Sequence, residues 1–411
     1  LVIGAGMSGL TTALEAAETG YKVTLLEKRP YVGGRVVQLS QYFPKMCPPT
    51  CGIEINIQRL KKSKNIDLHT LAEVESIEGE PGNYVVKFKV KPRYINEDCP
   101  EDKIEKYAEE ISLERSNEYN YDLDKTKVLY LPYNNCYPNK WVFDRDACTP
   151  DEAQMLADTY NDCIDLEQKE EIIEMRFKSI VWATGWKPYD SNKLENLGYK
   201  DYPGVINNVE MERYASPSGP TNGKIQIPGS DKEIESIAFV QCAGSRDENH
   251  LEYCSTICCL ASMKQARYVR EQYPDAKIHI FYIDLRAYGI MEDYYRETAK
   301  DENTFFHRGK VAKVKQEHGN DKYIVEAEDT LAGDINQAEV DMVVIATGMQ
   351  PVAADIPAFD KKHLDRNGFI KANGNGIIGC GVCVQPKDVA QIVREGTGAA
   401  IKAIHTIKRS K

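Results

Sequence analysis

The chain opens with Leu1-Val2-Ile3-Gly4-Ala5-Gly6-Met7-Ser8-Gly9, and these nine residues decide its fold. The three apolar residues predict a short strand, and the run from Leu10 to Glu18 predicts a helix. A strand, a glycine turn and a helix in this order are typical of a dinucleotide-binding unit. Gly4 permits the tight turn, Gly6 lets the backbone approach a pyrophosphate, and Gly9 lets the helix pack closely on the strand. The pyrophosphate would lie on the free N–H groups at the helix N-terminus.

The next segment indicates which dinucleotide is bound. Lys22–Leu26 is predicted to be the second strand, and Glu27 follows it, where a carboxylate can accept hydrogen bonds from an unphosphorylated ribose. Six residues further on, Gly33-Gly34-Arg35 would close a second backbone loop on the same pyrophosphate, and the arginine would offset its charge.

This glycine pair resembles the GG doublet of the two-dinucleotide-binding flavoproteins, the family of thioredoxin and glutathione reductases. Residues 180–185, an apolar strand ending in Ala-Thr-Gly, agree with the resemblance, as does the tail 377–381 followed by 396–400. The resemblance implies FAD, with the N-terminus of the tail helix facing the flavin pyrimidine. One departure is Gly381-Val382, because the family usually has Gly-Asp there and contacts the FAD with that carboxylate. The expected FAD-binding residues are Gly4, Gly6, Ser8, Gly9, Glu27, Lys28, Gly34, Arg35, Val74, Ala183, Thr184, Gly185, Gly381 and Val389.

A second nucleotide-type unit is predicted in the middle of the chain. Met342–Ile345 followed by Ala-Thr-Gly repeats the strand-turn signature, and the strand 237–241 should open this unit. Its loop is not glycine-rich but carries four cysteines, Cys242, Cys254, Cys258 and Cys259. Thiolates that approach from different directions suit a cubane iron–sulfur cluster, and a helix N-terminus would stabilise its negative charge. Buried packing of the cysteines and a zinc site are the alternatives.

The stretch 239–259, FVQCAGSRDENHLEYCSTICC, resembles the cluster-binding signature of the heterodisulfide reductase A-subunit. Other segments extend this resemblance along most of the chain outside residues 99–178. It implies that Cys242, Cys254, Cys258 and Cys259 bind a [4Fe–4S] cluster close to the FAD.

The chain lacks the ferredoxin-like inserts of the large members of that family. The spacing of Cys99, Cys136, Cys148 and Cys163 is too irregular for a ferredoxin motif. This shortened form and the motif 43–52, FPKMCPPTCG, resemble the A-subunit of the quinone-interacting membrane-bound oxidoreductase. The resemblance implies a second flavin/iron–sulfur subunit, a membrane haem/iron–sulfur subunit and electron exchange between menaquinone and adenylylsulfate reductase. The location expected is cytoplasmic, at the inner face of the membrane through the complex.

The fold class expected is α/β, a two-dinucleotide-binding-domain flavoprotein with its second nucleotide-type domain inserted in the FAD domain. Residues 1–98, 179–225 and 349–411 are assigned to the FAD-binding domain. Residues 226–348 are assigned to a degenerate NAD(P)-type domain with the iron–sulfur site. Residues 99–178 form an acidic, tyrosine-rich insert, interpreted either as a solvated excursion or as a docking surface for partner subunits.

Composition and net charge limit the classes of partner that we expect. The chain has 411 residues and a net charge of −11, so nucleic acid is not an expected partner. No apolar run approaches the roughly 18–20 residues of a spanning helix, and no secretory signal is visible, so membrane contact is expected only through partners. Twelve cysteines in a chain of this kind suggest metal or redox chemistry rather than structural disulfides.

The sequence leaves alternative roles for two pairs of cysteines. Cys47 and Cys51 are candidate redox thiols beside the flavin or incidental members of a rigid proline loop. For Cys380 and Cys383 we favour packing over a place on the electron path. The function expected is an oxidoreductase subunit for electron transfer. A stand-alone NAD(P)H-dependent disulfide reductase using Cys47 and Cys51, or a structural flavoprotein scaffold, are the alternatives.

Overall fold

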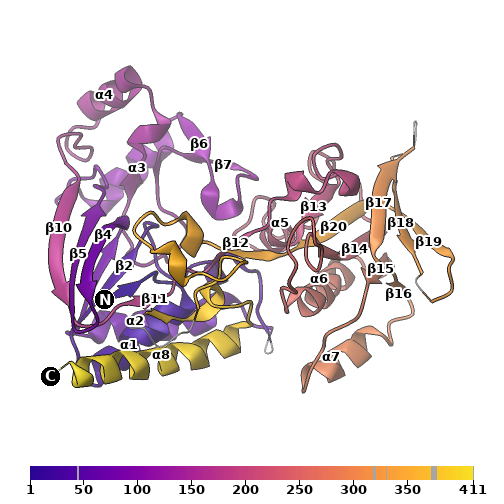
Figure 1. The fold of residues 1–411 in the computed structure, drawn as a ribbon. Coiled ribbons are helices and arrows are strands. Elements are labelled where there is room, and N and C mark those ends of the chain that lie inside the picture. Colours follow the sequence, from indigo (N-terminus) through magenta and orange to yellow (C-terminus); the bar gives the residue numbers. More distant parts are fainter. Residues whose placement is uncertain (44–45, 318–320, 330, 372–376, 411) are drawn as a thin grey trace.

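The computed structural model describes residues 1–43, 46–317, 321–329, 331–371 and 377–410. Two five-stranded parallel sheets dominate it, one in each half of the molecule (Figure 1). The first sheet has the order β22-β11-β1-β2-β3. Its strands are β1 (Val2–Ile3), β2 (Val23–Glu27), β3 (Ile66–Thr70), β11 (Val181–Trp182) and β22 (Ile378–Gly379). Segments far apart in the sequence therefore form one sheet.

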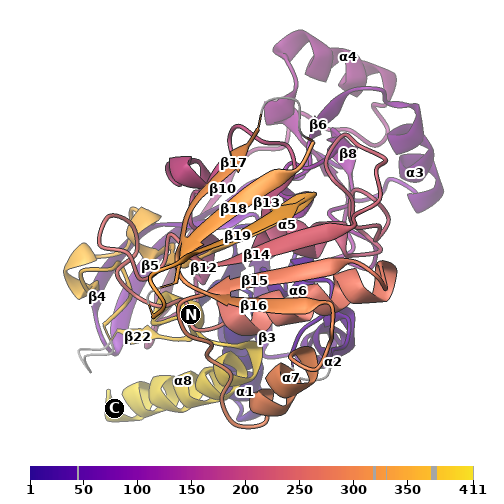
Figure 2. The same cartoon turned by 90° about the vertical axis from the view of Figure 1, so that its right-hand side faces the viewer.

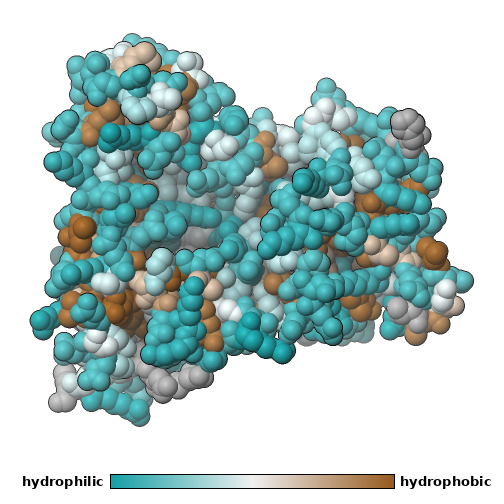
Figure 3. Space-filling view, turned by 45° about the horizontal axis from the view of Figure 1, so that its top comes forward, coloured by the Kyte–Doolittle hydropathy of each residue, from teal (hydrophilic) through white to brown (hydrophobic). Residues whose placement is uncertain are grey.

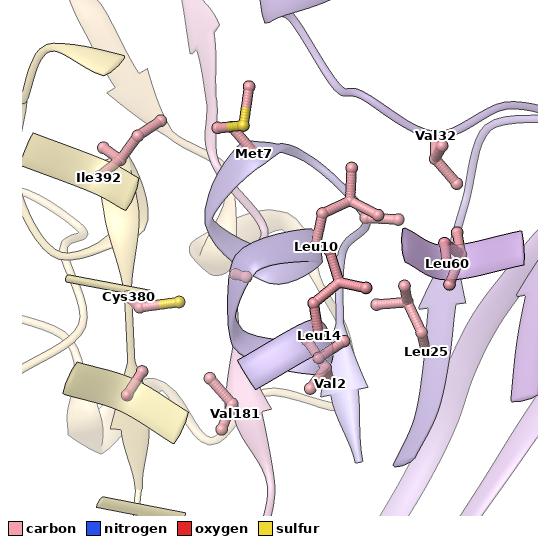
Figure 4. Packing of buried hydrophobic residues seen from close by; sticks show 14 of the residues in the cluster. Val2, Met7, Leu10, Leu14, Leu25, Val32, Leu60, Val181, Cys380 and Ile392 are labelled. Atoms are coloured by element: carbon pink, nitrogen blue, oxygen red, sulfur yellow. The ribbon is translucent and has the colours of Figure 1, made fainter. Parts of the chain in front are cut away.

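Helices α1 (Met7–Glu18) and α8 (Val389–Arg409) pack against each other beside the first sheet. Figure 4 shows Leu10 and Leu14 of α1 facing Leu25 of β2, while Cys380 and Ile392 of the C-terminal segment lie on the other side of the helix. Helix α2 (Pro49–Lys62) adds Ile53 and Leu60 to this core. The close packing of α1 against α8 brings the C-terminal segment to the first glycine loop.

The second sheet has the order β13-β20-β14-β15-β16 and is seen nearly face-on in Figure 2. Its strands are β13 (Val205–Asn207), β14 (Ser236–Ala243), β15 (Lys277–Tyr282), β16 (Thr304–Arg308) and β20 (Met342–Thr347). The helices of this half are α5 (Asn208–Tyr214), α6 (Cys258–Gln272) and α7 (Met291–Thr298). Every residue of β14 is buried, which is typical of a central parallel strand covered on both faces.

The chain crosses from the first half of the molecule to the second at an earlier residue than we expected. Strand β13 falls within residues 179–225, which we assigned to the FAD domain, but it pairs with β20 of the second sheet. A two-stranded antiparallel ribbon, β12 (Trp186–Pro188) with β21 (Met349–Pro351), joins the two crossings between the halves.

Each half also carries a three-stranded antiparallel sheet. In the first half it is formed by β4 (Ala72–Glu80), β5 (Asn83–Val90) and β10 (Glu171–Phe177). In the second half it is formed by β17 (Val311–Gln316), β18 (Tyr323–Glu328) and β19 (Ile335–Val340).

The insert folds as a unit with a core of its own, which includes Ile104, Phe143 and Leu156. Its elements are α3 (Glu101–Glu110), β6 (Glu114–Ser116), β7 (Lys125–Lys127), β8 (Leu129–Tyr130), β9 (Val142–Phe143) and α4 (Pro150–Thr159). A disulfide joins Cys99 to Cys163, at the two ends of this unit. The expectation that the cysteines form no structural disulfides is therefore wrong for this pair. A chain excursion of 64 residues with a small core gains most from a bond that closes it.

The aromatic residues at the centre of the insert do not form an exposed docking surface. Tyr119 and Tyr133 stack on each other and pack with Tyr31 against the first core. The face of the molecule in Figure 3 is mostly hydrophilic, with hydrophobic residues in scattered patches. Within the described residues, no helix is long and apolar enough to span a membrane.

Candidate functional site

The first glycine loop has the geometry of a nucleotide cradle. Gly4 has φ +101°, and a side chain there would collide with the backbone of Ala183. A side chain at Gly9 would overlap the carbonyl oxygen of Gly4. Positions 4 and 9 are therefore closed to Cβ atoms. The loop ends where α1 begins at Met7, so the free N–H groups of that helix line it.

The second glycine loop closes on the first, as the sequence predicts. The amide of Gly33 donates to the carbonyl of Ala5 at 2.8 Å, and Gly6 bridges to Gly33. A Cβ at Gly34, which has φ +60°, would lie 2.9 Å from the Cα of Gly6. Two backbones approach this closely only where side chains are absent.

Glu27 is buried at the end of β2, next to the cradle. One carboxylate oxygen accepts from the amide of Ala5 at 2.8 Å and the other from the amide of Arg29 at 2.9 Å. Burial raises the pKa of the Glu27 carboxyl, and these two amides oppose that rise. The carboxylate thus holds the glycine loop as well as standing where a ribose would contact it.

Arg35 is held by the insert and the ribbon. Its Nε donates to the carbonyl of Trp186 at 2.6 Å, and its Nη1 donates to the hydroxyl of Tyr121 at 3.0 Å. The guanidinium also faces the rings of both residues. Its predicted role at the pyrophosphate stays a prediction, and the structure adds that the insert fixes its position.

The third part of the cradle is the turn after β11. Ala183 and Thr184 lie against Gly4, and Gly185 has φ +70°. The hydroxyl of Thr184 is buried and has no hydrogen-bond partner among the described residues. A buried hydroxyl without a partner costs free energy, about 1–3 kcal/mol, unless a ligand or water satisfies it. This unpaired group and the cradle closed to side chains fit a bound dinucleotide.

The C-terminal segment completes the site. Gly381 lies against Ser8, where a side chain would collide with the serine hydroxyl. The amide of Gly381 donates to Glu395 on α8 at 2.8 Å. Glu395, which no sequence motif singled out, therefore brings a carboxylate to the place where Gly-Asp is replaced by Gly-Val. Only the packing of α8 reveals it, because the two residues are 14 positions apart. Val389 is the first residue of α8, next to the capping box of Asp388 and Gln391.

Two predicted residues lie away from these loops. Lys28 is exposed and pairs with Glu73 at 3.4 Å. Val74 is opposite Phe88 and packs in the core between the first sheet and the β4–β5–β10 sheet. Their contact with FAD stays a prediction.

The four predicted cluster cysteines lie at one place, the carboxyl end of β14 and the start of α6. Cys242 is the penultimate residue of β14, and Cys258 and Cys259 are the first two residues of α6. These three are buried, and Cys254, in the loop between, is half-buried. The thiols contact backbone groups: Cys259 Sγ donates to the carbonyl of Asp284 at 3.7 Å, and Cys254 Sγ accepts from the amide of Thr256 at 3.3 Å.

Burial and mutual repulsion disfavour the ionised form of these thiols. Burial raises the pKa of Cys258 well above its usual value, and the thiols of Cys242, Cys259 and Cys254 raise it further. Burial also raises the pKa of Cys242 to about 11. Metal ligation needs thiolates, so a cation at this place would have to displace the protons. Among the described residues, no three histidine, cysteine or acidic side chains lie close enough to hold a metal ion. The donor set, four thiols from a strand, a loop and a helix, fits a cluster that lies between its ligands.

The backbone of this loop is unusual. Cys242, Arg246 and Thr256 all have φ between +56° and +65°, a region that residues other than glycine rarely adopt. Each such residue costs of order 1 kcal/mol or more and persists where surrounding contacts over-determine it. Strain of this kind is typical of ligand sites.

A buried polar network connects the two loops, and the sequence did not reveal it. Glu212 of α5 pairs with Lys264 of α6 at 2.9 Å, and both side chains are 4% exposed. Glu212 also accepts from the amide of Ser40, and Lys264 donates to the carbonyl of Gln41 at 2.6 Å. The helix that begins with Cys258 is thus tied to the segment that follows the second glycine loop.

The remaining candidate thiols separate into two kinds. Cys47 is half-buried and Cys51, in the first turn of α2, is exposed. Burial raises the pKa of Tyr42, and the thiols of Cys51 and Cys47 raise it further, so both thiols lie near the Tyr42 ring. Their redox role stays a prediction, and residues 44–45 of the FPKMCPPTCG motif lie outside the described residues. Cys380 and Cys383 are fully buried, Cys380 in the core between α1 and α8, in agreement with packing.

Comparison with known proteins shows the fold and the relatives. Residues 2–48 match a family model described as an NAD(P)-binding Rossmann-like domain. Thioredoxin reductases from Lactococcus lactis, in the FR conformation, and T. acidophilum superpose with TM-scores of 0.53. They are 15% and 13% identical, and the superpositions cover 99% of this chain and 98% and 96% of theirs. The fold class we expected is therefore confirmed.

Higher identity is found to the A-subunits of heterodisulfide reductases. The chain is 36% identical to the CoB–CoM heterodisulfide reductase iron-sulfur A-subunit 2 of Methanopyrus kandleri, over 98% of this chain and 63% of that protein. It is 32% identical to the ferredoxin/F(420)H(2)-dependent CoB–CoM heterodisulfide reductase A-subunit of Methanosarcina acetivorans, over 99% of this chain and 53% of that protein. The chain thus spans 53% to 63% of the length of these two curated relatives.

Proposed function

We propose that the chain, which is 32% to 36% identical to A-subunits of heterodisulfide reductases over nearly its whole length, belongs to their family and is an FAD-binding, iron–sulfur subunit for electron transfer in a multi-subunit oxidoreductase. The observation that carries the proposal is the difference between the loops that follow the central strands of the two sheets. A glycine loop follows β1. At the corresponding place in the strand order, the end of β14, the loop after it and the start of α6 carry four cysteines.

FAD is the dinucleotide that the first site would hold. Gly4, Gly6, Ser8, Gly9 and Gly34 would bring backbone to the pyrophosphate, with Arg35 fixed nearby by Tyr121. Glu27 would accept from the ribose, and Ala183, Thr184 and Gly185 would line the cradle, where the Thr184 hydroxyl needs a partner. Lys28 and Val74 are proposed at the periphery, and Gly381 and Val389 beside the flavin at the start of α8. When bound, FAD takes up two electrons and releases them singly.

Cys242, Cys254, Cys258 and Cys259 are proposed to bind a [4Fe–4S] cluster. The residues of the chain would supply four thiolates, the positive end of α6 and a water-poor pocket, since three of the thiols are buried. Glu212 and Lys264 link α6, which begins with Cys258, to Ser40 and Gln41, which follow the second glycine loop.

The partners are proposed to be those of the quinone-interacting membrane-bound oxidoreductase. A second flavin/iron–sulfur subunit and a membrane haem/iron–sulfur subunit would flank the chain, which would pass electrons between menaquinol and adenylylsulfate reductase at the cytoplasmic face of the membrane. The resemblance of the FPKMCPPTCG motif and the irregular cysteine spacing in residues 99–178 support this assignment.

Anaerobic purification with assays of flavin, iron, zinc and acid-labile sulfide tests the cofactors. We expect one FAD and about four iron and four sulfide per chain. Cys258→Ala should lose iron and sulfide and keep FAD. Cys136→Ala, which changes a buried cysteine of the insert, is the matched control and should keep both. Flavin together with stoichiometric zinc and no sulfide would contradict the cluster.

Native co-purification from the source cell tests the partners. We expect the second flavin subunit and the haem-containing membrane subunit to co-purify, and a menaquinol analogue to reduce the flavin. Recovery of the chain with subunits that reduce a heterodisulfide, and no response to the quinol, would contradict the quinone assignment and leave the cofactors standing.

A further inference from the structure

Arg246 lies in the loop between Cys242 and Cys254, and two contacts define its position. Its amide donates to the carbonyl of Tyr253, the residue before Cys254, at 3.0 Å. Its guanidinium forms an ion pair with Asp284, whose carbonyl in turn accepts from the Cys259 thiol at 3.7 Å. The strained φ of +56° at Arg246 is maintained by these contacts.

The guanidinium charge also acts on Cys242. It opposes the rise in the pKa of this thiol that burial causes. Asp284 has a second partner, Arg286, at 3.6 Å. One carboxylate therefore neutralises part of the charge of two arginines next to the cysteines.

We propose that Arg246 raises the reduction potential of the iron–sulfur centre, and that Asp284 limits this effect by neutralising part of the guanidinium charge. This inference rests on the proposed function. Reduction adds one electron to a cluster that already carries negative charge, so a fixed positive charge nearby stabilises the reduced state. Asp284 is a positioning residue, because it acts through Arg246.

Exposure defines a second property of the pair. The side chain of Arg246 is 27% exposed and that of Asp284 is 49% exposed. Their contribution is therefore partly screened by salt, unlike that of a buried charge. The effect of Arg246 on the potential decreases as ionic strength rises.

The experiment is a redox titration of the full chain with FAD and cluster bound, followed by the EPR signal of the reduced cluster. Arg246→Gln lowers the midpoint potential, Arg246→Lys keeps most of the wild-type value because the charge remains, and Asp284→Asn raises it. Arg270→Gln is the matched control. It breaks the Arg270–Asp301 pair at the far end of α6, the helix that begins with Cys258, and leaves the potential unchanged.

Stability alone does not produce this pattern, because removal of a structural ion pair would not shift the potential in opposite directions for its two partners. Equal potentials in wild type, Arg246→Gln and Asp284→Asn, each with full iron and sulfide content, would overturn the inference and leave the cluster in place. Loss of the cluster from Arg246→Gln with FAD retained would also overturn it, since Arg246 would then be needed for assembly. A wild-type chain without iron and sulfide would instead contradict the proposed function.

Discussion

The two loops that follow β1 and β14 occupy the same topological position and differ in what they can hold. Each follows the third strand of a five-stranded parallel sheet, at the carboxyl end where open α/β sheets bind ligands. The loop after β1 is short, its residues are glycine and alanine, and position 4 has no room for a side chain, so it presents mainly backbone. The loop from Gly244 to Ile257 is long and presents one thiol and an arginine, and the strand and helix that flank it present three more thiols. The sheet provides the crevice, and the loop determines its chemistry.

The two loops are also stabilised differently. The glycine loop adopts positive φ at Gly4, where that conformation costs little. The cysteine loop adopts it at Cys242, Arg246 and Thr256, and hydrogen bonds such as Leu251 N to Gly244 O hold it in place. Variants that act on one loop and spare the other therefore test whether the two sites are independent.

The largest effect is expected where the two regions are joined. Glu212→Ala leaves Lys264 buried and unpaired, which should lower the free energy of unfolding by about 3–5 kcal/mol. Urea denaturation measures it. Glu271→Ala on α6 removes an exposed pair with Arg267 and should cost less than about 1 kcal/mol. Similar losses in both variants would show that the buried pair does not couple the two halves.

The disulfide of the insert is expected to affect the flavin side only. Cys99→Ser opens a loop of 64 residues and should destabilise the insert by about 2–4 kcal/mol. Because Tyr119 and Tyr121 of the insert contact Val37 and Arg35, FAD should dissociate faster while iron content is unchanged. Fluorescence of released FAD measures this. Cys148→Ser, at a cysteine outside the disulfide, is the control, and an equal rate in the two variants would refute the link.

Substitutions at two glycines of α8 distinguish the effect of close packing from the effect of helix propensity. A Cβ at Gly396 would lie 2.8 Å from the Ser8 carbonyl oxygen, so Gly396→Ala should cost about 1–3 kcal/mol and weaken FAD binding. Gly398 has open space, so Gly398→Ala should stabilise the chain by up to about 1 kcal/mol. Thermal unfolding and FAD titration test both. Equal effects would mean that α8 does not press on the glycine loop.

The smallest effect concerns the second sheet alone. Burial, together with His307 2.9 Å away, lowers the pKa of His279 to about 4. The unfolded chain takes up this proton near pH 6.5, so the contribution is complete above pH 6.5 and is lost as pH falls towards 4. After allowance for partial exposure, the loss is about 1 kcal/mol. His279→Gln should flatten the pH dependence of the melting temperature over this window, and an unchanged slope would contradict the prediction.

Part of the site could be predicted because it depends on neighbours in sequence. The approach of Gly6 to the Gly33–Gly34 doublet and the place of Cys258 and Cys259 at the start of α6 follow from strand–loop–helix spacing. The role of the insert could not be predicted. Composition shows that Tyr119 and Tyr133 are aromatic, but only packing shows that they face the core rather than a partner. The pairing of Cys99 with Cys163 likewise requires that two distant segments meet.

By itself, the sequence determined which chemistry each loop can perform, because backbone freedom at glycine and thiol ligation at cysteine are properties of the residue types. The tertiary structure alone decided which charges stand next to those loops. Glu395 reaches Gly381 through the packing of α8, Glu212 and Lys264 join two helices and a distant segment, and Arg246 meets Asp284 across the carboxyl ends of β14 and β15. Long-range pairs of this kind depend on the distance and direction of side chains on separate elements, and these are defined only when the sheets and helices have packed.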